Sequence, residues 1–436
     1  MTAAPGPGAV ATAGPYAALT MVRDGPGYVL GRRGGTDFVA VPEIGGQVIQ
    51  WLQGGCGLRE CERRAAEVAG EPVDVAGFLE GLAQAGLLPA AGPASGGTAE
   101  PGTAAPGTAA PGAGADEPPA IAPWQAAAGR VMFGRAGLAI QAVLAVTAAV
   151  VLLAVPGARP GPGDGVATGV PLASLLLLAA LATALGLAHE AAHVLAAWAA
   201  GVPSRISIGR RMIFIVYQTD LTRLWSVPRR ARVVPLLAGL LFDSAATGIL
   251  AVAGLILTGH APLLVVHLIR LAVLLNVGAI AFQFLIFLRT DVYALFVLAT
   301  GCRNLWATKG AVARRAVGRA GSADRAVLAA AGRRETRWAR VFLGLYLPGV
   351  AATGWYFAAF AVPATASIVR ACAHALAAGP WSMAGAAAVL ALALTAGSAA
   401  FVLAGLARSL ARLAGQVSRR PAAGAAMTDA AGRAGV

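Results

Sequence analysis

The stretch PLASLLLLAALATALGLAHEAAHVLAAWAA, residues 171–200, decides the fold, because it is almost wholly apolar and yet carries three ionisable side chains. It is longer than the roughly 20 apolar residues that cross a bilayer as a helix. A charged residue near the centre of such a helix costs about 2.5 to 3.5 kcal/mol on insertion scales. His189, Glu190 and His193 therefore indicate a functional site inside a membrane span.

The spacing of these three residues suits a metal ion. Residues four apart share one face of a helix, so His189 and His193 can direct both imidazoles to one metal ion. Glu190 lies one position further round the helix and can act as general base on a water molecule at that ion. The alternative is a pair of histidines that only hydrogen-bond across a helix bundle, with Glu190 as their partner.

The composition of the chain is that of an integral membrane protein. Of its 436 residues 57% are hydrophobic and 12% are charged, whereas soluble proteins carry about 25% charged residues. The formal net charge of +14 raises the question of a nucleic-acid partner. The arginines cluster in short segments between apolar runs, where they orient a protein in the bilayer, so we expect no nucleic acid.

Apolar runs and basic connections predict six membrane spans. Each run has the length that a bilayer needs, and the runs lie at about residues 136–156, 171–200, 233–258, 264–300, 341–361 and 383–407. The run 264–300 is too long for one straight span, and we expect it to bend. Every second connection is rich in arginine. The positive-inside rule then predicts a multi-pass protein of the cell membrane with both termini, and the opening of the site, on the cytosolic side.

The sequence pattern of residues 17–89 predicts a separate small domain. Residues 28–30 and 38–41 favour a β-hairpin around the Gly34-Gly35 turn. After Pro42 the apolar residues recur at helical spacing, which predicts helices within 44–52, 58–69 and 73–88. The fold class is therefore mainly α, a polytopic membrane helix bundle with a small N-terminal α+β domain of winged-helix type in the cytosol.

The remaining segments are rich in small residues and in proline. Such composition predicts disorder for residues 1–16 and 421–436. Residues 90–122 contain a repeated five-residue unit of Gly, Thr, Ala and Pro and are expected to form a flexible linker. The membrane domain then spans residues 123–420.

A third metal ligand should come from another span at a similar depth, because catalytic zinc usually takes three protein ligands and a water molecule. His193 lies seven residues before Ala200, about 10 Å from that end of its span. Asp291 lies nine residues before Thr300, and Asp243 lies ten residues into the run that opens near Val233. Either acid meets the depth requirement. A packing hydrogen bond is the alternative role for an acid at either position.

Residues 171–300 resemble the site-2 protease group of intramembrane zinc metalloproteases. His189, Glu190 and His193 match the His-Glu-x-x-His motif, and Asp291 takes the place of the aspartate in the group's late Asp-Gly motif. Asp243, in Ala238-Gly239-Leu240-Leu241-Phe242-Asp243, resembles an accessory polar position, and Asn276 is a second polar residue in the following span. Val292 replaces the usual glycine and Leu240 the usual proline. The resemblance implies Zn²⁺ held by His189, His193 and Asp291, with Glu190 as the catalytic base.

The N-terminal domain resembles the PqqD-like fold, the recognition element that binds leader peptides of ribosomally made, modified peptides. The resemblance rests on Tyr28-Val29-Leu30-Gly31, on Pro42-Glu43-Ile44-Gly45 and on the ending Gly86-Leu87-Leu88. It implies that an edge of the hairpin accepts a peptide as an added strand. A small adaptor or self-association domain is the alternative.

These observations predict a zinc endopeptidase that cleaves a membrane-associated or ribosomally made modified peptide, with that peptide and the lipid bilayer as partners. One alternative is a non-catalytic membrane receptor or export partner that binds a modified peptide. Another is a signalling protease that cuts a membrane-bound regulator. The substrate, the cleavage site and the oligomeric state are left open by the sequence.

Overall fold

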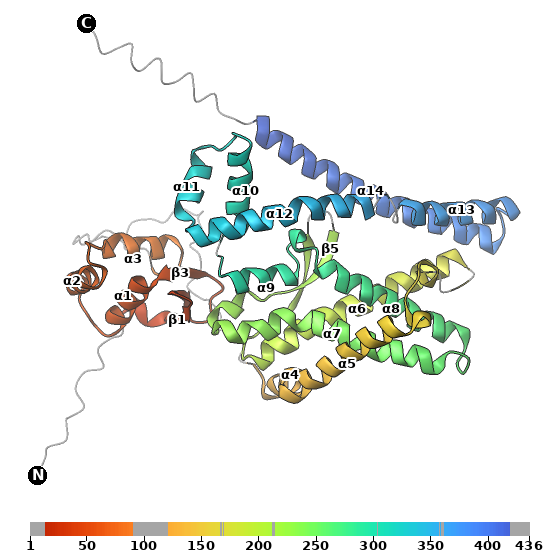
Figure 1. The fold of residues 1–436 in the computed structure, drawn as a ribbon, viewed down its shortest axis with the longest axis horizontal. Coiled ribbons are helices and arrows are strands. Elements are labelled where there is room, and N and C mark those ends of the chain that lie inside the picture. Colours follow the sequence, from red (N-terminus) through yellow and green to blue (C-terminus); the bar gives the residue numbers. More distant parts are fainter. Residues whose placement is uncertain are drawn as a thin grey trace, which may run out of the picture.

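The computed structural model describes residues 14–418 except 90–120, 166, 167, 169, 212, 213, 303, 357 and 359–361. Figure 1 shows a small N-terminal domain at one end of a helical bundle, and α12 to α14 along one side of it. The predictions of disorder for 1–13 and 421–436, and of a linker at 90–120, fall outside the described residues. Pro15–Ala18 form a 3-10 turn, so regular structure begins just before residue 17.

The N-terminal domain contains a three-stranded antiparallel sheet in the order β1-β2-β3. The strands are β1 (Leu19–Asp24), β2 (Gly27–Arg32) and β3 (Phe38–Pro42). β2 and β3 are the predicted hairpin, and β1 pairs with the other edge of β2. Because side chains alternate along a strand, Leu30 and Val41 face the domain core while Val29 and Ala40 lie on the opposite face of the sheet.

Three helices complete this domain and lie close to the predicted ranges. They are α1 (Glu43–Gln53), α2 (Leu58–Ala69) and α3 (Val75–Gln84). Asp74 caps α3 by accepting from Gly77 N at 2.7 Å. Leu30, Ile49, Cys61 and Leu82 are almost fully buried in one apolar core, so the domain has a core of its own.

Five helical stretches in the described part of the chain are long and apolar enough to cross a membrane. They are formed by α4 (Pro123–Phe133) with α5 (Arg135–Ala154), α6 (Pro171–Ala199), α7 (Arg229–Leu257), α8 (Leu263–Gln283) and the first half of α14 (Met383–Ser418). α7 packs against α5, α6, α8 and α9 and is the central helix. Val143, Val146 and Val150 of α5 are exposed, as the lipid-facing side of a span would be.

The sixth predicted span, 341–361, is not among these five. Residues 341–356 belong to α12 (Arg333–Tyr356), which begins in a basic segment and contains Pro348, residues 357 and 359–361 lie outside the described part of the chain, and α13 (Val362–Ala378) begins after the predicted span. The arginines at the start of α12 shorten its apolar part below the length of a span. The prediction that 264–300 bends is confirmed, because α8 ends at Gln283 and α9 (Asp291–Thr300) starts after a short turn, η5 (Ile286–Leu288).

An aromatic cluster joins α9 to α10 (Leu305–Ala316) and α12, and α11 (Ser322–Ala330) packs against α10. Lys309 of α10 is 8% exposed and lies 3.8 Å from the ring centre of Trp306 and 3.7 Å from that of Tyr346. Burial lowers the pKa of the Lys309 ammonium, and the ring faces offset part of that desolvation through cation–π contacts.

The N-terminal domain contacts the bundle through a buried arginine. Arg232 of α7 is 2% exposed, stacks on Trp225 and lies 3.3 Å from the carboxylate of Asp24 at the end of β1. Trp225 belongs to a short helical turn, η4 (Thr222–Ser226), that packs against β1 and β2. Arg223 of that turn donates to the carbonyl of Gly34 at 3.3 Å. The outer face of the sheet therefore lies against the end of the bundle where α7 begins.

Candidate metal centre

α6 presents both histidines on one face, as their spacing predicts, and their neighbours fix both rings. His189 Nδ1 lies 2.8 Å from Asp243 Oδ2 of α7, and His193 Nδ1 lies 2.7 Å from the carbonyl oxygen of Pro235. The Pro235 carbonyl and the Asp243 carboxylate accept, so each Nδ1 atom carries a proton, and in the neutral rings both Nε2 atoms are acceptors. This tautomer is the one in which histidine binds a metal ion through Nε2.

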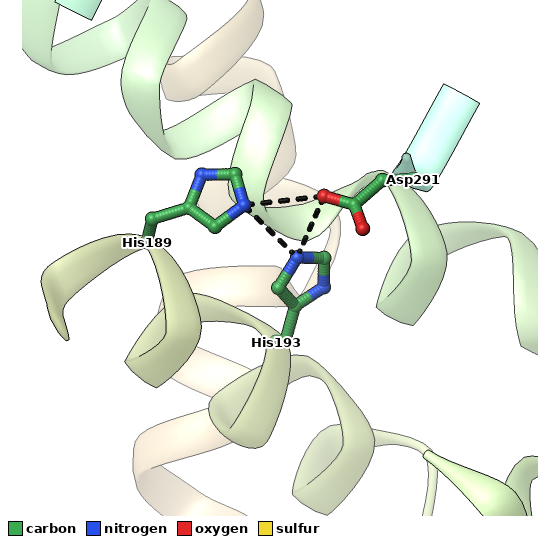
Figure 2. A group of neighbouring side chains, drawn as sticks. All are labelled: His189, His193 and Asp291. Carbon is green, nitrogen blue, oxygen red and sulfur yellow. Dashed lines mark hydrogen bonds and ion pairs between the residues drawn. The ribbon is translucent and has the colours of Figure 1, made fainter. Parts of the chain in front are cut away.

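The third residue is Asp291, the first residue of α9 (Figure 2). Its Oδ2 lies 3.1 Å from the Nε2 atoms of both His189 and His193, which are 3.3 Å from each other. With both rings neutral, these three acceptor atoms repel one another unless a metal ion or a proton lies between them. His193 is 2% exposed and His189 9%, so water screens this repulsion little.

The separations of these atoms fit a metal ion of the size of zinc. Nitrogen and oxygen ligands lie about 2.0 to 2.1 Å from zinc, so two corners of a tetrahedral site are about 3.3 Å apart. The three observed separations are 3.1, 3.1 and 3.3 Å. His189, His193 and Asp291 form the one group of described residues whose His, Cys and acidic side chains are placed to share a metal ion. The geometry fits a divalent metal and does not identify it.

Gln283, the last residue of α8, holds the turn that delivers Asp291. Its side-chain oxygen accepts from Asp291 N at 3.1 Å, its carbonyl accepts from the Thr290 hydroxyl at 2.5 Å, and its Nε2 lies 3.3 Å from His189 Nε2. Arg289 in this turn has a left-handed backbone with φ 60°, the only positive φ among the described residues other than glycine. A left-handed backbone at a residue other than glycine costs about 1 kcal/mol or more. The hydrogen bonds of Gln283 therefore stabilise a strained turn.

Gly239 of α7 allows the two imidazoles to lie against a helix backbone. A Cβ atom at this position would overlap the His189 ring and would lie 2.7 Å from His193 Nε2. No other residue type fits here without moving the rings. Gly239 therefore belongs to the site although it offers no ligand atom.

Glu190 is tied to a β-hairpin beside the bundle. The hairpin consists of β4 (Ile206–Arg211) and β5 (Phe214–Thr219), in the region predicted to be extended. The hydroxyl of Thr219, at the end of β5, lies 2.7 Å from Glu190 Oε2 and 2.9 Å from the Glu190 carbonyl oxygen. The Thr219 hydroxyl thus orients the Glu190 carboxylate.

The structure thus brings His189, His193 and Asp291 together and places the other predicted residues around them. Asp243 accepts from His189 on the side of the ring away from Asp291. Asn276 is 1% exposed and lies about two helical turns before Gln283, but it forms no hydrogen bond with the three residues. Gln283, Thr219 and Gly239 were not predicted. An amide seven residues after Asn276 in an apolar run was the available signal for Gln283.

Comparison of the chain with protein-family models, with curated proteins and with solved structures finds no match.

Proposed function

We propose that this protein is a membrane metalloprotease of site-2 protease type that hydrolyses a peptide bond with a zinc ion held by His189, His193 and Asp291. The observation that carries the proposal is the convergence of two buried imidazoles and a half-buried carboxylate, with Nε2 and Oδ2 atoms 3.1 to 3.3 Å apart, next to a glutamate that binds none of them. A metal site that is only structural needs no general base beside it. A hydrolytic site needs one as general base.

Each side chain of the site has a separate task. Asp243 and the Pro235 carbonyl hold the proton of each neutral ring on Nδ1, which turns Nε2 towards the metal, and Gly239 leaves room for the rings. A bound zinc ion would supply a polarised water molecule and a Lewis acid for the scissile carbonyl. Glu190, oriented by Thr219, would accept a proton from the attacking water molecule and pass it to the leaving amine.

The substrate we propose is a peptide, presented in an extended conformation. A helical substrate hides its carbonyl groups in backbone hydrogen bonds, so it must unwind before hydrolysis. The β4–β5 hairpin offers strand edges for this purpose, and β5 ends at Thr219, which contacts Glu190. In the proposed arrangement the N-terminal domain, with its PqqD-like resemblance, binds the peptide on the cytosolic side and delivers it for leader removal or maturation.

The test is metal-dependent hydrolysis by the purified full chain in lipid nanodiscs. The substrates are the peptides encoded next to its gene, and mass spectrometry detects new peptide termini. We expect cleavage that a chelator abolishes and that one equivalent of zinc restores. Cleavage that continues at full rate after the metal has been removed would contradict the proposal. Metal binding without any cleavage would favour the non-catalytic receptor.

A further inference from the structure

Two clefts lie between the N-terminal domain and the metal centre. The interdomain cleft, about 630 Å³, separates the outer face of the sheet from the ends of α7, α9 and α12, and its walls include Phe38, Ala40, Arg229 and Arg334. The inner cleft, about 440 Å³, lies between η4, α7, α9 and α10, and its walls include Leu236, Arg289 and Trp306. Both volumes fall in the range of ligand sites, about 300 to 1,000 Å³.

The two clefts are neighbours, and the wall of the inner cleft includes residues next in the chain to those of the metal centre. Trp225, Val297 and Leu298 belong to the walls of both. The inner cleft reaches Leu236, which follows the residue whose carbonyl binds His193, and Arg289, two residues before Asp291. None of His189, His193 and Asp291 lines either cleft, so the clefts approach the metal centre only as far as these neighbouring residues.

One face of an edge strand forms part of the wall of the interdomain cleft. β3 pairs with β2 on one side only, and its other edge has no partner strand in the described part of the chain. Phe38, Ala40 and Pro42, alternate residues of β3, line the interdomain cleft. An extended peptide can add to such an edge through main-chain hydrogen bonds.

The charge of the walls selects the kind of peptide. Arg229, Arg289 and Arg334 form no ion pair with any described carboxylate; Arg229 donates to the Leu298 carbonyl, and Arg289 lies 5.3 Å from the Trp306 ring centre. The acids in the walls, Asp24 and Glu335, already have partners in Arg232 and in the main chain of Asn304. Leucine, valine and aromatic side chains make up most of the rest of the inner cleft, and the interdomain cleft adds glycine, alanine and proline to residues of these kinds.

We propose that the two clefts together bind one extended peptide with acidic side chains and lead it from β3 towards His193 and Asp291. This inference rests on the proposed function, because only a hydrolytic site needs such a route. Side chains of an extended peptide alternate in direction, so acidic residues at every second position can face the three arginines. The apolar residues between them then face the leucine and aromatic side chains.

A binding experiment tests this inference without cleavage. It uses three fluorescent peptides and the full-length Glu190→Gln protein in neutral-lipid nanodiscs. The peptides alternate valine with glutamate, glutamine or lysine, and fluorescence anisotropy gives their affinities. We expect the glutamate peptide to bind about tenfold more tightly than the glutamine peptide. Arg334→Gln and Arg289→Gln should each remove most of that difference and leave the glutamine peptide unchanged.

Arg337→Gln is the matched control, because Arg337 is an exposed residue of α12 that lines neither cleft. Arg334→Glu should make the protein prefer the lysine peptide, a gain that a misfolded variant cannot show. Equal binding of the glutamate and lysine peptides, or an equal loss in Arg337→Gln, would overturn the proposal. Intact charge-selective binding in a protein whose wild type cleaves nothing would instead contradict the proposed hydrolysis alone.

Discussion

Gly239 lies so close to His189 that a single methyl group on Gly239 would overlap the imidazole ring. The backbone of α7 therefore forms one wall of the metal centre. α7 also supplies Asp243, four residues on, and the Pro235 carbonyl, four residues back, which fix the two rings. One face of α7 thus determines the position and the tautomer of both histidines.

Gly239→Ala should weaken metal binding by about 10- to 100-fold, as loss of residues that position metal ligands usually does. The reason is that both rings must move away from α7. Gly186→Ala in α6 is the control, since a Cβ there meets no other atom within 4 Å. Competition with a fluorescent zinc chelator measures both affinities. Unchanged affinity in Gly239→Ala would show that the rings do not rest against α7.

Asp291→Ala and Asp243→Asn should separate a metal ligand from a residue that orients one. Asp291→Ala removes one of the three converging atoms and should abolish stoichiometric zinc. Asp243→Asn keeps an acceptor oxygen for His189 Nδ1 and should lower affinity by only about tenfold. Elemental analysis after gel filtration tests this order. A larger loss in Asp243→Asn would transfer the ligand role to Asp243.

The sequence alone predicted the elements that depend on local pattern. The helices at 44–52 and 58–69, the strands at 28–30 and 38–41, and the break within 264–300 follow from apolar periodicity and from turn residues. The pairing of His189 with His193 follows from helical spacing. Asp291 as the third residue of the group followed from depth and from a family resemblance.

The remaining features depend on contacts between segments far apart in the chain. Gln283 binds His189 across 94 residues and Thr219 binds Glu190 across 29, and no local pattern encodes either contact. Gly239 is one of several glycines in α7, and nothing in the local sequence indicates that two imidazoles lie against it. The contact of Asp24 with Arg232 spans 208 residues, and it joins a domain to the bundle beyond a stretch predicted to be a linker.

Asp24→Asn should loosen the N-terminal domain from the bundle. Arg232 would remain buried without a carboxylate, which should weaken docking by about 1 to 2 kcal/mol. Hydrogen exchange should then rise in β1, in β2 and around Trp225, while the domain core around Ile49 stays protected. Asp37→Asn, at an exposed position of the same domain, is the control. Unchanged exchange in Asp24→Asn would mean that this ion pair does not hold the domains together.

Lys309 should resist amine-reactive reagents in the folded protein. It is the only lysine of the chain, and the rings of Trp306 and Tyr346 cover its ammonium group. Peptide mapping should find Lys309 labelled only after unfolding in detergent, whereas a lysine introduced by Arg337→Lys should react in both states. Rapid labelling of native Lys309 would contradict the aromatic cluster between α10 and α12.

The most direct measurement is the hydrolytic rate of Glu190→Gln beside that of the wild type, at equal zinc content. Glu190 is proposed to move a proton, whereas His189, His193 and Asp291 are proposed to hold the metal; this division of roles decides the outcome. It therefore predicts that Glu190→Gln keeps about one zinc per chain and loses cleavage by at least about 100-fold, while His189→Ala and His193→Ala lose both. Full proteolysis by zinc-loaded Glu190→Gln would contradict the central claim.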